Sequence, residues 1–213
     1  YCPGRDFSWQ LRELEAAGAS WDYHGPGCAV QSLPAPALAG AIQYRNAATA
    51  LTALQFTFST GACEHARIAA GLRAVTLPGR FQIIAGAVEW IVDVAHNEAA
   101  ARVLAAALSQ RACTGRTLAV AGMLADKDVA AVAQALDPVV DHWLLAGIED
   151  EPRGLSADEL KQRLPAVRAP VERSSNVAAA CARARDLARP DDRVVVFGSF
   201  HVAGPALDWL GLY

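Results

Sequence analysis

Hydrophobic residues follow two alternating patterns along the last two thirds of the chain. Short apolar runs rich in β-branched residues are followed by longer segments in which apolar residues recur at helical spacing. The short runs predict strands and the longer segments predict helices, because side chains repeat every two residues on one face of a strand and about every 3.6 residues on a helix. The predicted strands cover residues 88–94, 117–121, 140–145 and 194–197. The predicted helices cover residues 98–110, 128–136, 157–164, 177–187 and 204–210.

The alternation of strands and helices from Leu77 onward is typical of a doubly wound α/β domain. Several of the predicted strands are apolar at nearly every position, which suits a parallel sheet that is covered by helices on both faces. The predicted fold class is therefore α/β, with a Rossmann-like, doubly wound, mostly parallel sheet. We place the domain boundary at a hinge near residues 75–78, which divides the chain into residues 1–75 and 76–213.

The first third of the chain has a different pattern. Residues 1–40 contain many Gly and Pro residues around short apolar runs, which predicts short strands and loops. Two helices, 47–58 and 63–73, are predicted to follow, with Asn46 as the N-cap of the first. Two such helices cannot bury their apolar faces alone, so we expect them to pack against a sheet that this chain does not contain.

Composition limits the class of protein. A chain of 213 residues with 53% hydrophobic residues and a net charge of −3 is typical of a soluble globular protein, and it offers no basic surface for nucleic acid. No apolar run approaches the roughly 20 residues of a membrane-spanning helix, and the first residues do not resemble a signal peptide. The five cysteines are widely spaced and form no CxxC pair, so we expect reduced thiols and neither a disulfide framework nor a zinc site. These features favour a cytoplasmic protein that binds neither nucleic acid nor membranes.

Polar residues lie at or shortly after the ends of three of the predicted strands. These residues are Asp93 and His96, then Asp126 and Lys127, and finally Ser199 and His201. They are candidate site residues because doubly wound sheets bind ligands outside the carboxyl ends of their strands. Arg80 follows Pro78-Gly79 in a tight turn, and a guanidinium is a fixed fork of donors for phosphate or carboxylate oxygens. Residue types alone favour the interpretation of Arg80 as an exposed turn residue, and Asp93 could be the N-cap of the next helix.

Other site chemistries lack their sequence signatures. Ser199 does not lie in the G-x-S-x-G elbow of a hydrolase. A zinc site from Asp93, His96 and His201 has suitable residue types but no supporting spacing. No G-x-G-x-x-G follows a predicted strand, which argues against NAD or FAD, and neither a G-x-x-x-x-G-K-[ST] phosphate loop nor any Gly-Lys pair occurs in this sequence.

Five motifs lie at or near these positions. They are Asn46-Ala47-Ala48-Thr49-Ala50, Leu77-Pro78-Gly79-Arg80-Phe81, Asp93-Val94-Ala95-His96-Asn97, Gly122-Met123-Leu124-Ala125-Asp126-Lys127-Asp128 and Gly198-Ser199-Phe200-His201. Together they resemble the C-terminal half of the folylpolyglutamate synthase/dihydrofolate synthase family, in its bacterial bifunctional form, which belongs to the Mur ligase superfamily. The resemblance covers nearly the whole chain. Glu98 stands where the family usually has proline, an exchange that the helix dipole favours at a first turn.

The resemblance implies an ATP-dependent amide ligase. Such an enzyme uses MgATP to convert a carboxylate of dihydropteroate, or of a folate γ-glutamyl tail, into an acyl phosphate, and the amine of L-glutamate then attacks it. The resemblance implies ATP contacts from Asn46, Arg80 and Asp93, contacts on the glutamate or folate side from His96 and Ser199, and further substrate-side candidates in Asp126 and Lys127.

In that family the phosphate loop, the magnesium ligands and a modified lysine all precede the segment matched here. We therefore expect a C-terminal fragment in which residues 1–75 are the tail of the central ATP-binding domain and residues 76–213 are the C-terminal glutamate ligase domain. We expect the fragment to be inactive alone and the protein to be monomeric. The alternatives are another Mur-type amide ligase and a noncatalytic α/β nucleotide-binding or interaction module.

Overall fold

A computed structural model describes residues 2–12, 20–57, 64–148 and 150–212. The chain divides into two compact units, Tyr1–Leu77 and Pro78–Tyr213. Each unit contains a hydrophobic core of its own. No helix in the described part of the chain is both long enough and apolar enough to span a membrane.

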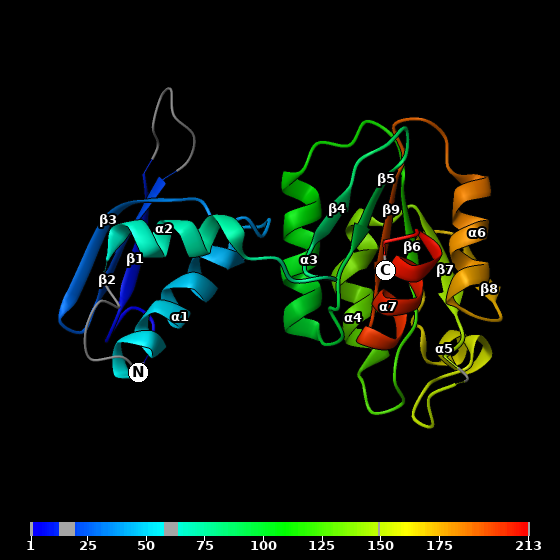
Figure 1. Ribbon diagram of the computed structural model, residues 1–213. Coiled ribbons are helices and arrows are strands. Elements are labelled where there is room, and N and C mark those ends of the chain that lie inside the picture. The colour runs from blue at the N-terminus through cyan, green and yellow to red at the C-terminus, as the bar shows by residue number, and fades with distance from the viewer. Residues whose placement is uncertain (1, 13–19, 58–63, 149, 213) are drawn as a thin grey trace. The chain divides into compact units, whose positions relative to one another are not determined.

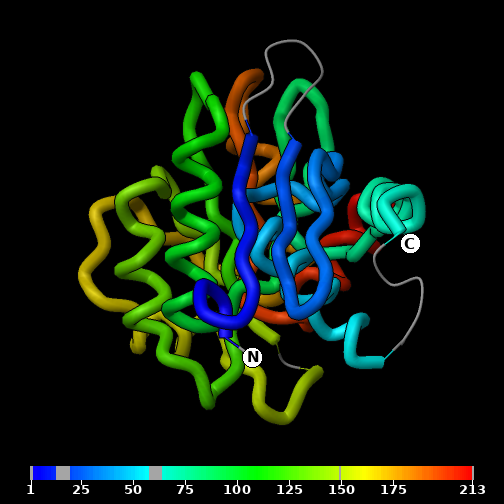
Figure 2. The backbone as a smooth tube through the Cα atoms, turned by 90° about the vertical axis from the view of Figure 1, so that its left-hand side faces the viewer, coloured from blue at the N-terminus to red at the C-terminus, as the bar shows by residue number. Residues whose placement is uncertain are grey.

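The first unit consists of an antiparallel sheet and two helices. The strands β1 (Ser8–Arg12), β2 (Ser20–Gly25) and β3 (Cys28–Pro34) pair in sequence order, and Figure 2 shows them side by side. The helices are α1 (Ile42–Thr57) and α2 (His65–Ala74). These elements confirm the short strands and the two helices predicted for this region.

The helices of the first unit pack against the chain's own sheet, so the expectation of a sheet outside the chain is wrong. One buried cluster consists of Phe7, Trp21, Tyr23, Val30, Leu33, Ala48, Leu51 and Ile68, and Trp9 on β1 packs against it. The hydroxyl of Tyr23 on β2 lies 2.8 Å from Oγ1 of Thr52 on α1. Trp21 and Tyr23 alternate along β2 and therefore reach the same face, which supplies the apolar surface that the helices need.

Cys28 on β3 is disulfide-bonded, so the expectation of reduced cysteines is wrong at this position. Cys2, Cys113 and Cys181 are free thiols. Burial raises the pKa of Cys181 to about 12, which keeps that thiol protonated at neutral pH. Disulfide formation depends on the approach of two Cα atoms to within about 7 Å, which sequence spacing does not reveal.

The second unit is a six-stranded sheet with helices on both faces. Its strands are β4 (Gln82–Ile84), β5 (Glu89–Val92), β6 (Thr117–Ala121), β7 (His142–Ala146), β8 (Val171–Ser174) and β9 (Arg193–Phe197). Their spatial order is β4-β5-β9-β6-β7-β8, and only β4 runs antiparallel to its neighbour. The helices are α3 (Glu98–Gln110), α4 (Val129–Leu136), α5 (Ala157–Arg163), α6 (Val177–Leu187) and α7 (Phe200–Trp209), and a 3₁₀ turn covers Asp137–Val139. The doubly wound, mostly parallel α/β fold is confirmed.

Successive residues of the central strands enter two different layers of the core. Val194 and Val196 of β9 belong to the cluster that contains α6 and α7. Phe197 points the other way and meets Trp143 of β7 edge-on, with ring centroids 6.2 Å apart, in a group that includes residues of α4 and α5. Figure 1 shows α3 and α6 on opposite sides of this sheet. The continuously apolar strands are therefore explained by burial on both faces.

Three element predictions for the second unit need correction. The edge strand β8 was missed because Glu172 and Arg173 give it the polar composition of a sheet edge. The short antiparallel strand β4 was also missed. Helix α7 begins at Phe200 and contains Pro205, whereas the prediction began the helix at residue 204.

Candidate active site

The order of the strands creates a switch point at β9. Strands β6, β7 and β8 follow one another outward, and α6 then returns the chain so that β9 lies between β5 and β6. After β9 the chain enters α7, which packs with α6, whereas after β5 and β6 it enters α3 and α4, which pack with each other on the opposite face. Ligands bind at such points in open α/β sheets because neighbouring loops leave the sheet in opposite directions.

Two glycines allow the ends of β6 and β9 to approach closely. The N–H of Gly122 donates to the carbonyl of Phe197 at 3.3 Å. Gly198 adopts φ +123°, and a Cβ atom there would lie 1.9 Å from the carbonyl oxygen of Gly122. A larger residue at Gly198 would therefore separate the loops that carry the candidate residues.

Asp93 joins the end of β5 to the turn before β4. Its two carboxylate oxygens accept hydrogen bonds from the N–H of Phe81 at 2.8 Å and the N–H of Ala95 at 2.7 Å. Burial raises the pKa of Asp93, and these hydrogen bonds and the charges of Arg80 and His96 oppose that rise. The interpretation of Asp93 as a helix N-cap is wrong.

The turn that carries Arg80 has an unusual backbone on both sides of it. Gly79 has φ +69° and Phe81 has φ +47°, a region that non-glycine residues rarely enter. The hydrogen bond from Phe81 to Asp93 holds this conformation, while a Cβ at Gly79 would approach Val94 Cγ1 to 3.1 Å. Arg80 itself is exposed, so the turn presents its side chain outward.

His96 and Asn97 have different roles at the start of α3: His96 is a candidate for ligand binding, and Asn97 caps the helix. Nδ1 of His96 lies 2.9 Å from the carbonyl oxygen of Val94, so Nδ1 carries a proton and donates a hydrogen bond to that carbonyl. Nε2 is then the ring nitrogen that remains for a ligand. Asn97 is the N-cap of α3 and accepts a hydrogen bond from the N–H of Ala100.

Ser199 occupies the N-cap position of α7 but does not cap the helix with its side chain. Its carbonyl accepts from the N–H groups of Val202 and Ala203. The residue is 6% exposed, and its hydroxyl has no hydrogen-bond partner within the described structure. A buried hydroxyl without a partner is unfavourable, so a ligand that bonded to it would gain affinity.

Asp126 and Lys127 bind each other on the loop after β6. Nζ of Lys127 lies 2.7 Å from Oδ2 of Asp126, and this hydrogen bond lowers the pKa of the exposed Asp126 carboxyl. Nη1 of Arg153 lies 3.8 Å from the other carboxylate oxygen.

Asn46 lies in the first unit, whereas the other candidate residues lie in the second. It is inside α1, four residues after the helix begins at Ile42, so the predicted N-cap role is wrong. Its Nδ2 donates to Oε1 of Gln43 at 3.1 Å.

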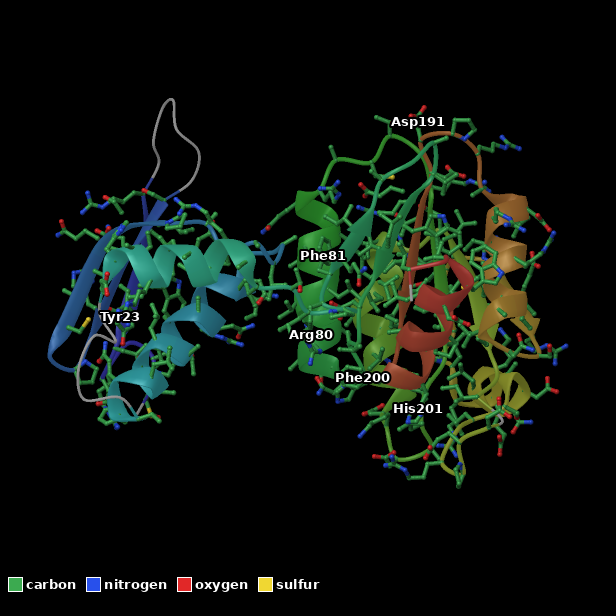
Figure 3. All side chains as sticks on the ribbon, viewed as in Figure 1. Tyr23, Arg80, Phe81, Asp191, Phe200 and His201 are labelled. Carbon is green, nitrogen blue, oxygen red and sulfur yellow. The ribbon has the colours of Figure 1, made fainter. Side chains whose placement is uncertain are left out.

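Sequence reasoning missed one contact at the site. The guanidinium carbon of Arg80 lies 5.4 Å from the ring centroid of Phe200, and Figure 3 shows the two residues at the same end of the second unit. Phe200 and His201 also line a cavity of about 550 Å³ that extends to the ends of β7 and β8. Nε2 of His201 lies 3.6 Å from a carboxylate oxygen of Glu151. No pattern in the sequence indicated that Phe200 would meet Arg80.

The described residues contain no group of three or more His, Cys, Asp or Glu side chains placed to hold a metal ion. The groups suited to a phosphorylated ligand are the guanidinium of Arg80 and the first N–H groups of α7. The carboxylate of Asp93 could accept from ribose hydroxyls.

These features define a class of protein, an α/β ligand-binding domain with its site at the switch point of the sheet. Residues 79–200 match the family described as "Mur ligase, glutamate ligase domain". Because this match covers more than half of the chain, the chain belongs to the Mur ligase family. The resemblance noted from the motifs is confirmed.

Individual relatives agree with this assignment. The chain is 36% identical over 204 residues to the dihydrofolate synthase/folylpolyglutamate synthase of Escherichia coli K12, covering 96% of this chain and 45% of that protein. The structure of E. coli FolC in complex with DHPP and ADP has a TM-score of 0.84 and 33% identity, covering 98% of this chain and 47% of that one. The structure of a bifunctional folylpolyglutamate synthase/dihydrofolate synthase with Mn, AMPPNP and L-glutamate bound has a TM-score of 0.82 and 34% identity, covering 100% of this chain and 48% of that one. The chain thus spans about half the length of the relatives it matches.

Proposed function

We propose that this chain is the C-terminal part of an ATP-dependent ligase that adds L-glutamate to dihydropteroate, to folate polyglutamate tails, or to both. The observation that carries the proposal is the turn around Arg80, which Asp93 fixes at the carboxyl edge of the sheet. Membership of the Mur ligase family supports the reaction class, and relatives with ADP or with AMPPNP and L-glutamate bound support the ligands.

The proposed reaction has two steps. A carboxylate oxygen of the pteroate or folate attacks the γ-phosphorus of ATP, which forms an acyl phosphate and releases ADP. The amine of glutamate then attacks the acyl carbon, loses a proton and displaces inorganic phosphate, so an amide is formed. We assign the phosphate loop and the magnesium ligands to the part of the protein that precedes this chain.

The residues of this chain have proposed roles in binding and orientation. Arg80 donates to phosphate oxygens and offsets the charge that develops on the transferring phosphoryl group. Asp93 accepts from the ribose hydroxyls, and Asn46 contacts the nucleotide from the first unit. His96, through Nε2, and Ser199, through its unpaired hydroxyl, hold the carboxylates of glutamate, with Asp126 and Lys127 as further candidates on the same side.

The two units correspond in this proposal to the tail of the ATP-binding domain and to the C-terminal domain. Closure about a hinge near residues 75–78 would bring the amine and the acyl phosphate together. A monomeric state and a cytoplasmic location stay predictions. The disulfide at Cys28 is unusual for that compartment.

The test compares the 213-residue chain with the complete protein that contains it. The complete protein should release phosphate from MgATP only when glutamate and a pteroate or folate acceptor are both present. The chain alone should release none above background, because its sequence contains no phosphate loop. Turnover by the rigorously purified chain would contradict its assignment as a fragment, and acceptor-independent hydrolysis by the complete protein would contradict the ligase.

A further inference from the structure

Phe200 is unusually exposed for a large apolar residue. It is the first residue of α7 and is 63% exposed, the highest value among the large hydrophobic side chains in the described segments. A single exposed apolar residue needs no explanation by itself. The position of this ring against Arg80 does, because Arg80 is the group to which the proposed function assigns the phosphates of ATP.

Among the described residues, the ring of Phe200 is the only group in direct contact with the Arg80 guanidinium, while the charge of Arg80 also acts on the nearby carboxylate of Asp93. The distance of 5.4 Å from Cζ to the ring centroid is within the roughly 6 Å over which a cation is attracted to an aromatic face. No carboxylate in the described structure forms an ion pair with this guanidinium. Elsewhere in the second unit carboxylates do hold guanidinium groups, as in Arg111 with Glu89 and Arg116 with Asp192.

An aromatic partner leaves the arginine competent to bind an anion. An aromatic ring attracts the cation through its π face and offers no lone-pair acceptor, so the five in-plane N–H donors of the guanidinium stay available to an anion. A carboxylate partner would occupy those donors and would have to be displaced by phosphate oxygens. The ring therefore restricts the motion of a long, flexible side chain without blocking its function.

The two sides of this stack are fixed to each other. A Cβ at Gly79, beside Arg80, would approach the Cβ of Ala203 on α7 to 3.3 Å, so the turn packs directly on the helix that carries Phe200. Ser199 accepts hydrogen bonds from the N–H of Ala203, which sets the start of that helix. Both backbones are therefore defined before any ligand arrives.

We propose that Phe200 is a positioning residue that holds the guanidinium of Arg80 ready for the phosphates of the nucleotide. This inference rests on the proposed function, in which Arg80 contacts ATP. Phe200 acts through Arg80 and makes no contact of its own with the nucleotide phosphates.

The first experiment measures kcat and KM for ATP and glutamate in the complete ligase with substitutions at Phe200. Phe200→Ala should lower kcat/KM for ATP about two- to five-fold, the range that an exposed cation–π contact supplies. Phe200→Tyr keeps the aromatic face and should retain the native kcat/KM for ATP. Phe200→Leu keeps only the bulk of the side chain and should lower kcat/KM as much as Phe200→Ala does. Val103→Ala, at an exposed apolar residue of α3, is the matched control and should change nothing.

The second experiment repeats Phe200→Ala in an Arg80→Ala background. The effect of Phe200→Ala should disappear there, because its only route of action has been removed. An equal effect in both backgrounds, a change confined to KM for glutamate, or no effect of Phe200→Ala while Arg80→Ala impairs the enzyme would each overturn the inference. Normal activity of Arg80→Ala would instead reject the role of Arg80 in the proposed function, and with it the basis for a role of Phe200.

Discussion

Asp192 at the amino end of the six-stranded sheet and two residues at its carboxyl end, Arg80 and Ser199, differ in whether their side chains have hydrogen-bond partners. At the amino ends of β6 and β9, Asp192 accepts hydrogen bonds from the N–H and guanidinium of Arg116 and from the N–H of Arg189. At the carboxyl ends, neither the guanidinium of Arg80 nor the hydroxyl of Ser199 has a hydrogen-bond partner within the described residues. Figure 3 shows Asp191, next to Asp192, at the opposite end of this unit from Phe200.

The difference separates groups that stabilise the fold from groups that are available to a ligand. Burial opposes the ionisation of both Asp192 and Asp93. At Asp192 the hydrogen bonds from Arg116 and Arg189 outweigh burial, so the pKa is lowered, whereas at Asp93 burial prevails and the pKa is raised. The carboxylate of Asp192 is thus electrostatically satisfied at the amino edge, whereas the buried Asp93 carboxyl and the unpaired Ser199 hydroxyl are unfavourable features of the carboxyl edge that a bound nucleotide and amino acid would relieve.

The largest expected effect is on catalysis by Arg80 in the complete ligase. Arg80→Ala should reduce kcat by about 100-fold or more, because an arginine that stabilises a transferring phosphoryl group is lost. Arg80→Lys should recover only part of this, since lysine lacks the planar fork of donors. Steady-state kinetics would measure both, with Arg102→Ala on the surface of α3 as the control. A kcat near that of the unmodified enzyme would return Arg80 to the interpretation of an exposed turn residue.

The next effect is on stability at the amino edge. Asp192→Asn should lower the stability of the second unit by about 2 kcal/mol, because two backbone N–H groups and a guanidinium lose a charged acceptor. The 41% exposure of the Arg116 side chain keeps the loss below that of a fully buried pair. Hydrogen exchange of the β6 and β9 amides measures this loss of stability, with Asp208→Asn as the control. If Asp192→Asn left exchange unchanged but impaired catalysis, Asp192 would belong to the site and would not be a group that stabilises the fold.

A smaller effect should distinguish the residues of the carboxyl edge that bind glutamate from those that bind ATP. Ser199→Ala and His96→Ala each remove one hydrogen bond to a charged ligand, so each should raise KM for glutamate about ten-fold and change KM for ATP much less. Asp93→Ala should show the opposite pattern. Ser109→Ala, whose hydroxyl bonds only within α3, is the control for loss of a hydroxyl. If the Ser199 and His96 variants impaired ATP alone, the division would be wrong.

The smallest effect is a difference in pH dependence. The lowered pKa of Asp192 stabilises the fold above the ordinary carboxyl pKa of about 3.9, and this contribution is lost as pH falls below that value. The raised pKa of Asp93 has the opposite sign: its ionisation costs stability, and the cost develops as pH rises above 3.9 through the folded-state value. The penalty for Asp192→Asn should therefore grow as pH rises from 3 to 6, and that for Asp93→Asn should shrink. Penalties that changed in the same direction would contradict the opposite shifts.

Regular elements were predictable from the sequence because they depend on local periodicity. Strand β6 and helices α3 and α6 have the bounds that the apolar pattern predicted. The start of α7 was missed because Gly204 and Pro205 suggested a boundary, although the last strand leads into the helix after only two residues.

The site was predictable as a set of strand ends but not as a set of contacts. Asp93 could be placed beside a helix start, yet its hydrogen bond to Phe81 depends on a positive φ that no local signal gives to phenylalanine. The stack of Arg80 on Phe200 joins distant parts of the chain and arises only when β9 returns to the centre of the sheet. Such contacts follow from topology, which periodicity does not determine.

The most direct test of the contrast between the two edges is to follow the arginine Nε–H resonances of the complete ligase by NMR while ATP is added. Arg80→Lys and Arg116→Lys variants would assign the two signals. We predict that the Arg80 signal shifts on binding of nucleotide and that the signal of Arg116, whose guanidinium is bonded to Asp192, does not. An unmoved Arg80 signal in the nucleotide-saturated protein would contradict a role of Arg80 in nucleotide binding.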